Sequence, residues 1–190
     1  MKAISPCVLI LLIALFWAPH PAHASITIDG KPLDWKGIPV LAEIDASATD
    51  NPLAYRYHQG PLGMLKVCQG KENVYVLVAI SQKLETSQGI VDQYRSAVQL
   101  PIYLKFFLKG GTLDLTCLLG QGEKLRGPKS KEVEGTASAT GSDSTYFYHE
   151  MFFPIDLLSP EGEKTRVNMD VIYGGRSIFV KVPFSIKTYR

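Results

Sequence analysis

Most of the chain after residue 25 alternates between hydrophobic and polar positions, or carries short apolar runs rich in Val, Ile, Tyr and Phe. A period of two places successive side chains on opposite faces of an extended segment, so these stretches predict β-strands. Gly, Pro, Asn and Asp bound them. The pattern predicts about nine strands, at residues 26–29, 39–44, 64–69, 73–81, 99–108, 112–119, 144–153, 166–173 and 177–186.

Three pairs of these strands are joined by very short connections. Residues 70–72, 109–111 and 174–175 all contain glycine, which adopts the positive φ of tight turns without steric cost. The best helical candidate, residues 84–97, is interrupted by Gly89 and is predicted mostly as a loop. Hairpins without long helices predict an all-β fold, an antiparallel sandwich or barrel.

Two longer stretches are predicted as connections. Residues 45–63 contain three aromatic rings, and residues 121–143 are rich in Gly, Ser, Thr, Lys and Glu. We expect the second to be mostly a solvated excursion with a short hairpin around Val133. Its basic cluster is broken by Pro128 and followed by two glutamates, which favours a solvated loop over a polyanion site. That cluster consists of Lys124, Arg126, Lys129 and Lys131.

The first 24 residues are organised like a cleavable secretory signal. Lys2 supplies a positive start, residues 7–18 are apolar, and Ala22 and Ala24 place small residues where a signal peptidase cuts. The apolar run is shorter than the about 20 residues that span a membrane. We therefore expect cleavage before Ser25, no membrane span after cleavage, and a location in the periplasm or outside the cell.

Residues 25–190 have the length of one domain and leave no room for a second. The whole chain has 20 Lys and Arg against 18 Asp and Glu, a formal net charge of +2, and loses Lys2 with the signal. A nearly neutral chain gives no electrostatic reason to expect nucleic acid or an anionic membrane as partner.

Two cysteines, Cys68 and Cys117, lie in the part of the chain expected outside the cytoplasm, where disulfides persist. Alternation places Cys117 with Leu115 on an apolar face and Cys68 beside the polar Lys66 on its own face. A bridge and two buried free thiols are both open at this point. No paired Cys-x-x-Cys metal or redox motif is present. We predict no metal site and no cofactor in the first interpretation of the chain.

Three segments resemble the family 9 carbohydrate-binding module superfamily, which includes DOMON-like domains. Residues 26–35 have its opening, with Asp29-Gly30 and then Trp35. Residues 65–80, with Tyr75 after a polar turn, resemble its hairpin, and residues 148–157, with Glu150 and Pro154, resemble its late strand. The resemblance implies a β-sandwich of the immunoglobulin-like type, shared by domains that bind sugars and others that bind haem.

Each of these landmarks also has an expected physical role. Asp29-Gly30 suits a tight turn, because Gly accepts positive φ and Asp bonds nearby amides. Trp35 is expected as a core plug at one end of the sandwich rather than as a sugar platform. Glu150 is expected to be an exposed or edge-paired carboxylate. Family members that grip sugars clamp them between two indole rings, and this chain has one tryptophan after the signal.

A sugar site needs flat aromatic faces and a few polar groups that bind hydroxyls. The best candidates are Tyr55, Tyr57 and His58 in the first long connection and Tyr94 in the second. Alternate spacing places Tyr55 and Tyr57 on one side of an extended segment. The alternative is that these rings only cover one end of the sandwich.

The sequence therefore predicts an exported, non-catalytic ligand-binding module whose partner is a glycan or a cell-envelope protein. One alternative is an interaction or structural domain on the same scaffold without a sugar site. Another is a non-covalent haem binder, for which His58 and His149 with Met64, Met151 and Met169 are the available axial donors. No Gly-x-Ser-x-Gly elbow or paired acids support an enzyme, and Ser87, His58 and Asp92 form no motif.

Overall fold

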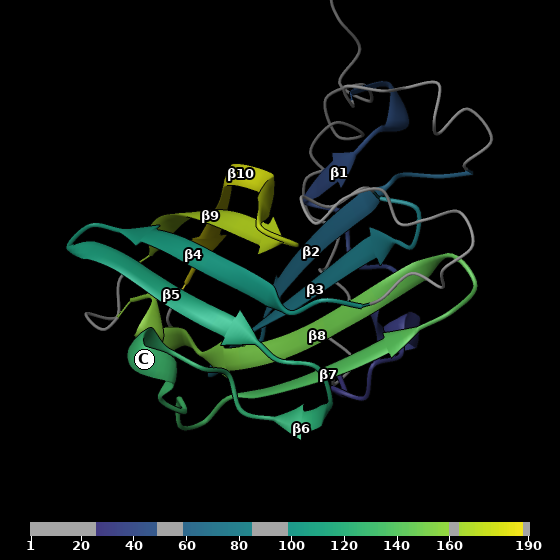
Figure 1. The fold of residues 1–190 in the computed structure, drawn as a ribbon. Helices are drawn as coiled ribbons and strands as arrows, with labels where there is room; N and C mark the ends of the chain where they lie inside the picture. The colour runs from purple at the N-terminus through teal and green to yellow at the C-terminus, as the bar shows by residue number, and fades with distance from the viewer. Residues whose placement is uncertain (1–25, 49–58, 85–98, 160–163, 188–190) are drawn as a thin grey trace, which may run out of the picture.

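The computed structural model describes residues 26–48, 59–84, 99–159 and 164–187. Within these ranges two antiparallel sheets form a sandwich (Figure 1). The six-stranded sheet has the order β1 (Ala42–Ile44), β2 (Gly63–Gln69), β3 (Asn73–Ser81), β8 (Tyr146–Pro154), β7 (Ala137–Ser142), β6 (Gln121–Glu123). The four-stranded sheet has the order β10 (Arg176–Ile186), β9 (Thr165–Tyr173), β4 (Ile102–Leu108), β5 (Gly111–Cys117). The antiparallel β-sandwich predicted from the sequence is confirmed.

The three hairpins predicted from glycine-containing turns are present. The strand pair next to the turn is Gln69 with Val74 in the β2–β3 hairpin and Leu108 with Gly111 in the β4–β5 hairpin. In β9–β10, Gly174 and Gly175 turn the chain with φ of 56° and 77°. Side chains other than glycine rarely adopt such values, so the turn depends on these two residues.

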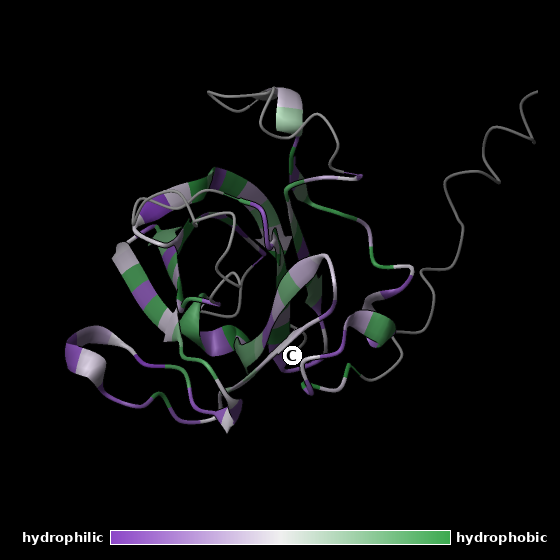
Figure 2. Cartoon of the chain, turned by 45° about the vertical axis from the view of Figure 1, so that its right-hand side comes forward, coloured by the Kyte–Doolittle hydropathy of each residue, from purple (hydrophilic) through white to green (hydrophobic). Residues whose placement is uncertain are grey.

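An apolar core fills the space between the sheets. Hydrophobic and hydrophilic residues alternate along several strands, as expected when one face of a strand is turned to this core (Figure 2). Phe106 of β4 contacts Phe153 of β8 edge to face, with ring centroids 5.4 Å apart, so these two rings join the layers. Phe106 also packs against Phe184 of β10 at 6.3 Å. Burying each such side chain contributes about 1.5–3 kcal/mol.

The outer face of the six-stranded sheet is covered by the N-terminal segment, residues 26–41. Trp35 ends a 3-10 turn over Pro32–Trp35, is fully buried, and packs with Leu77, Ala79 and Tyr148. The Lys66 ammonium donates to Trp35 O at 3.0 Å. The indole is thus a buried core residue as predicted, but it lies outside the sandwich on one sheet and not at the end between the sheets.

The carboxylate of Glu150 fixes this segment to β8. Its Oε1 accepts the Trp35 Nε1–H at 2.9 Å, and its Oε2 accepts the N–H of Asp29 at 3.0 Å and of Gly30 at 2.7 Å. Glu150 is fully buried, so the prediction of an exposed or edge-paired carboxylate was wrong. Burial raises the pKa of Glu150 to about 7, although the three N–H donors act to lower it.

The predicted strand at residues 26–29 was also wrong. The segment is irregular, because Asp29 gives its N–H to the Glu150 side chain and not to a neighbouring strand. The Asp29 side chain accepts the Lys31 N–H at 2.9 Å, which closes the turn expected from Asp29-Gly30. Gly30 has a φ of 78°, within the region that favours glycine.

Residues 121–143 contain two strands that the sequence did not predict. β6 and β7 extend the six-stranded sheet, and β7 pairs with β8 along its whole length. Ser138 and Ala139 are fully buried, so this half of the stretch is not a solvated excursion. The short hairpin expected around Val133 is present as the bridge between Arg126 and Glu132.

The small residues of β7 let the N-terminal segment lie directly on the sheet. A Cβ atom placed on Gly141 would come within 2.1 Å of Gly30 O, and one placed on Gly30 would come within 2.6 Å of Thr140 O. Both obstacles are backbone atoms, which cannot rotate away. The two glycines therefore set the distance at which Glu150 reaches the N–H groups of Asp29 and Gly30.

The two cysteines are free thiols on opposite sides of the six-stranded sheet. Cys117 belongs to the core between the sheets, whereas Cys68 packs against the outer cluster around Trp35. Of the two alternatives, the structure shows the free thiols and not the bridge. Burial raises the pKa of Cys68 to about 11 and that of Cys117 to about 12, so both stay protonated and unreactive at neutral pH.

We predict that Gly141→Ala destabilises the protein by about 2–3 kcal/mol, because the added methyl group forces the N-terminal segment off the sheet. Urea unfolding followed by the fluorescence of Trp35 measures the change. Gly110→Ala is the matched control, since nothing lies within 4 Å of a Cβ at that turn position. Equal unfolding midpoints for the two variants would contradict the close approach of Gly30 and Gly141.

A second prediction concerns pH. The pKa of Glu150 is about 7 in the folded state and near 4.5 in the unfolded chain, so the folded state holds this proton more tightly. Ionisation of Glu150 therefore lowers the stability of the wild type as pH rises from about 4.5 to 7. Relative to Glu150→Gln, which does not titrate, the wild type should lose about 2–3 kcal/mol between pH 5 and pH 8. Parallel stability curves for the two proteins would rule out this titration.

Candidate functional site

The four aromatic residues predicted to contact a ligand, Tyr55, Tyr57, His58 and Tyr94, lie outside the described residues. They belong to residues 49–58 and 85–98, and the chain on either side of both segments is described. The positions of these flanks show from which part of the sandwich the segments leave. The four side chains themselves stay a prediction.

Both segments leave the sandwich at the same end. The Leu62 N–H donates to Ile44 O at 2.7 Å, and the Ser81 N–H donates to Leu62 O at 2.8 Å. The end of β1, the start of β2 and the end of β3 are thereby adjacent. The next residue, Gln82, donates its N–H to Thr145 O at 2.9 Å, in the turn between β7 and β8.

The return of the second segment lies at this end too. The side-chain amide of Gln99 donates to Tyr148 O at 3.0 Å and to Gly141 O at 3.3 Å. We define the tyrosine-rich end of the sandwich by residues 59–62, 82–84, 99–100 and 142–148. Six of the nine tyrosines of the chain are associated with this end. Tyr146 and Tyr148 lie on it, Tyr173 lies beside it, and Tyr55, Tyr57 and Tyr94 belong to the two segments that leave it.

Asp143 organises the described part of the tyrosine-rich end. Its Oδ1 accepts the N–H of Thr145 at 2.7 Å and of Tyr146 at 2.8 Å, and its Oδ2 accepts the Tyr148 hydroxyl. The Tyr146 hydroxyl donates to Pro61 O at 2.8 Å, which ties the chain after the first segment to β8. The rings of Tyr146 and Tyr148 lie 6.2 Å apart at 41°.

The charge of this group follows from its hydrogen bonds. Partial burial acts to raise the pKa of Asp143, but donation from Tyr148 and from the N–H groups of Tyr146 and Thr145 lowers it overall. Burial and the nearby Asp143 charge raise the pKa of Tyr146, while burial and the hydrogen bond to Asp143 raise that of Tyr148. At neutral pH the end therefore holds one exposed carboxylate and two neutral phenols.

Asp143, Tyr146 and Tyr148 were not among the residues predicted from the sequence to form a site. Tyr146 and Tyr148 alternate in a predicted strand, where a role in the sheet was sufficient explanation. The available signal was Asp143 directly before Ser144-Thr145, a turn sequence in which an aspartate side chain bonds the N–H groups that follow it.

His149 lies on the inner face of β8 beside the tyrosine-rich end and is fully buried. Its ring meets the edge of the Tyr173 ring at 6.0 Å, and its Nε2 lies 3.3 Å from the Gln99 side-chain nitrogen. Its Nδ1 has no hydrogen-bond partner among the described residues. Burial lowers the pKa of His149 to about 3, so the ring is neutral in the folded protein at neutral pH.

Of the four candidate haem ligands that the structure describes, Met64 lies on the other side of the six-stranded sheet from the remaining three. Met151 and Met169 are fully buried in the core between the sheets, whereas Met64 packs on the outer face of the six-stranded sheet. His149 is on the inner face, and His58 lies outside the described residues. Within the described ranges, His, Cys, Asp and Glu side chains also form no group of three that would hold a metal ion.

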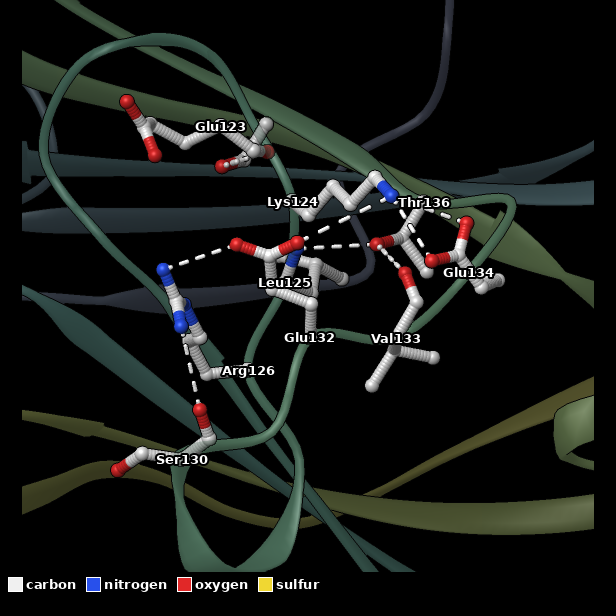
Figure 3. A network of polar contacts seen from close by, with 10 residues as sticks. Glu123, Lys124, Leu125, Arg126, Ser130, Glu132, Val133, Glu134 and Thr136 are labelled. Carbon is white, nitrogen blue, oxygen red and sulfur yellow. Dashed lines mark hydrogen bonds and ion pairs between the residues drawn. The ribbon is translucent and has the colours of Figure 1, made fainter.

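The basic cluster of residues 124–131 is partly neutralised by its own neighbours (Figure 3). The Lys124 ammonium lies 2.9 Å from Glu134 Oε1 and 3.9 Å from Glu132 Oε2, and the Arg126 guanidinium lies 3.1 Å from Glu132 Oε1. Glu134 raises the pKa of Lys124 through a hydrogen bond. These two cations are thus engaged within the protein.

No protein-family model and no curated protein sequence matches the chain. Its structure is similar to two solved structures of a family 9 carbohydrate-binding module from Caldicellulosiruptor kristjanssonii. The one in complex with cellotriose has 14% sequence identity and a TM-score of 0.47 over 78% of this chain and 72% of that chain. The one in complex with glucose has 12% identity and a TM-score of 0.47 over 78% and 73%. The likeness concerns the fold alone.

One further structural finding concerns membranes. In the part of the chain that the structure describes, no helix is long and apolar enough to cross a bilayer. Residues 1–24, with the expected export signal, lie outside that part.

We predict that His149 makes the protein sensitive to acid. The unfolded chain takes up a proton on this residue near pH 6.5, whereas the folded protein resists it until about pH 3, so stability falls as pH decreases through this window. Relative to His149→Gln, the wild type should lose about 2 kcal/mol between pH 7 and pH 5. At pH 7, where the ring is neutral in the folded state, the difference in unfolding free energy between the two proteins gives the part of the effect that does not depend on pH. A constant difference between the proteins would argue against a buried neutral ring.

Proposed function

We propose that this chain is an exported, non-catalytic module that binds a glycan at the tyrosine-rich end of its sandwich. The observation that supports the proposal is that the described flanks of both tyrosine-bearing segments meet beside the β7–β8 turn. Pro61, after the first segment, accepts the Tyr146 hydroxyl, and Gln82, before the second, donates its N–H to Thr145 O. Export rests on residues 1–24, whose positive start, apolar run and small residues before Ser25 are those of a signal peptide.

The chemistry of this end suits a saccharide. A pyranose ring presents C–H groups on its faces and hydroxyls around its edge, so it binds where aromatic rings lie beside a few polar groups. Tyr55, Tyr57 and Tyr94 would supply the faces. The ionised Asp143, exposed at the turn, and the amide of Gln82 would accept and donate hydrogen bonds to hydroxyls.

A second candidate is a protein-interaction domain without a sugar site, with a cell-envelope protein as partner. It is favoured by one observation at the same end. Tyr148 is 7% exposed and its hydroxyl is taken by Asp143, and the Tyr146 hydroxyl is taken by Pro61 O. Two of the six tyrosines therefore serve the fold, which leaves the ligand contacts to the other residues of the end.

The double variant Tyr55→Ala/Tyr57→Ala tests the proposal. It should weaken retention of the protein in affinity electrophoresis gels that contain β-glucan, xylan or galactomannan, because both flat faces are removed from this end. Tyr75→Ala is the control, since this half-buried ring lies on the outer face of the six-stranded sheet against Phe152, away from the β7–β8 turn. Unchanged retention of the double variant would exclude these two rings from the site and leave the protein-interaction domain as the better explanation.

A further inference from the structure

On the outer face of the four-stranded sheet, a central strand exposes an aromatic ring to solvent. Tyr103 is 48% exposed and is the only aromatic among the exposed large hydrophobic side chains of the described residues. It lies on β4, which pairs with β5 on one side and with β9 on the other. Its partners in register are Thr116 and Ile172, both too small to cover the ring. The ring is therefore presented to solvent on a part of the sheet where the strand pairing is regular.

The next row of outward-facing residues is charged. Two positions along the strands, Asp114, Lys105 and Asp170 lie side by side across β5, β4 and β9. Lys105 lies 5.7 Å above the ring of Phe107 and forms no ion pair within 4.0 Å with either aspartate in the described structure. Asp170 uses one oxygen to accept the Lys181 N–H at 2.6 Å. The three side chains stand on strands about 4.8 Å apart, and their unused donors and acceptors are left for a ligand.

A third row completes the surface. Phe107 is half-buried and is flanked in register by Thr112 and Asn168. At about 3.4 Å per residue, its Cα lies about 13 Å from that of Tyr103, with the charged row between them. We call the nine residues of these three rows the sheet-face surface, namely Tyr103, Lys105, Phe107, Thr112, Asp114, Thr116, Asn168, Asp170 and Ile172.

We propose that the sheet-face surface is a second binding site, and that its ligand is a neutral oligosaccharide. The exposed ring stacks on the C–H face of one pyranose. Hydroxyl groups both donate and accept, so a row with both signs of charge binds them, whereas a polyanion would meet Asp114 and Asp170 and a polycation would meet Lys105. The three rows extend over about 13 Å along the strands, more than one pyranose covers, so the ligand is a chain of sugars and not a single one.

A second copy of the chain is a poorer occupant of the same surface. The centres of protein interfaces are depleted of charged residues, and stable ones bury about 800 Å² on each partner. Here three charged side chains lie at the centre, and the one strongly exposed apolar group is Tyr103. The proposal shares with the proposed function only the chemical class of the ligand, because the residues and the face of the molecule differ.

The test is affinity electrophoresis of the full protein against uncharged polysaccharides, namely β-glucan, xylan and galactomannan. Tyr103→Ala should weaken the retention by at least one of them by about five- to tenfold, the range expected for losing one stacked ring. Tyr103→Phe keeps the ring and should retain wild-type binding. Leu33→Ala is the matched control for loss of an exposed apolar group, since Leu33 is 74% exposed on the N-terminal segment.

The outcomes separate the two proposals. Two sites are supported if Tyr103→Ala weakens retention and Tyr55→Ala/Tyr57→Ala removes only part of it. If the double variant abolishes retention and Tyr103→Ala does not change it, the proposal for the sheet-face surface alone is overturned. Absence of wild-type retention on every polysaccharide overturns both proposals. Dimerisation of the wild type that Tyr103→Ala abolishes, without an effect on retention, assigns the surface to self-association and overturns the proposal.

Discussion

The buried carboxylate of Glu150 ties the first segment of the chain to a strand more than a hundred residues away in sequence. It accepts three N–H donors, two from the backbone of Asp29 and Gly30 and one from the Trp35 indole. A buried charge is stable only when its oxygens are bonded in this way. The arrangement therefore demands the close approach of Gly30 and Gly141, the small residues of β7, and the position of Trp35 over Leu77 and Ala79.

This anchor decides which surfaces are left for a ligand. The N-terminal segment covers part of the outer face of the six-stranded sheet, and the two sheets cover each other's inner faces. The outer face of the four-stranded sheet and the tyrosine-rich end stay open among the described residues. Both expose polar groups beside tyrosines. These two regions, which share no side chain, are therefore the surfaces of the sandwich at which a ligand can bind.

Residues 166–173 could be predicted as a strand because their apolar and polar side chains alternate, as the closing of the sandwich on one face requires. Residues 73–81 could be predicted because they carry a short apolar run rich in Val and Ile, which is buried on both faces of the sheet. β7 could not, because Ala-Ser-Ala-Thr-Gly-Ser has neither bulk nor hydrophobic contrast. Its residues are small because another backbone lies on them. The apolar-polar pattern carries no record of that contact, so a central strand looked like a solvated connection.

The candidate site shows the same limit. Aromatic residues in long connections could be selected from the sequence, but their common origin at one end depends on register, through pairs such as Ile44 with Gly63 and Ser81 with Tyr146. The burial of Glu150 depends on partners far away in the chain, so it was predicted as exposed. Local propensity predicts that a segment forms a strand, whereas tertiary contacts decide which of its polar groups become buried.

His149 and Glu150 are adjacent on β8 and face opposite sides of the sheet, where each is buried by a different layer. Both are less easily charged than in water, but the charge has opposite sign, so pH acts on them in opposite directions. Between about pH 5 and 6.5, raising the pH removes the cost of keeping His149 neutral and adds the cost of ionising Glu150. Their contributions partly cancel in this window, so the intact protein responds less to pH there than either variant. Above about pH 8 both groups have finished titrating, and the stability of the anchor depends on the three N–H donors that the ionised Glu150 accepts.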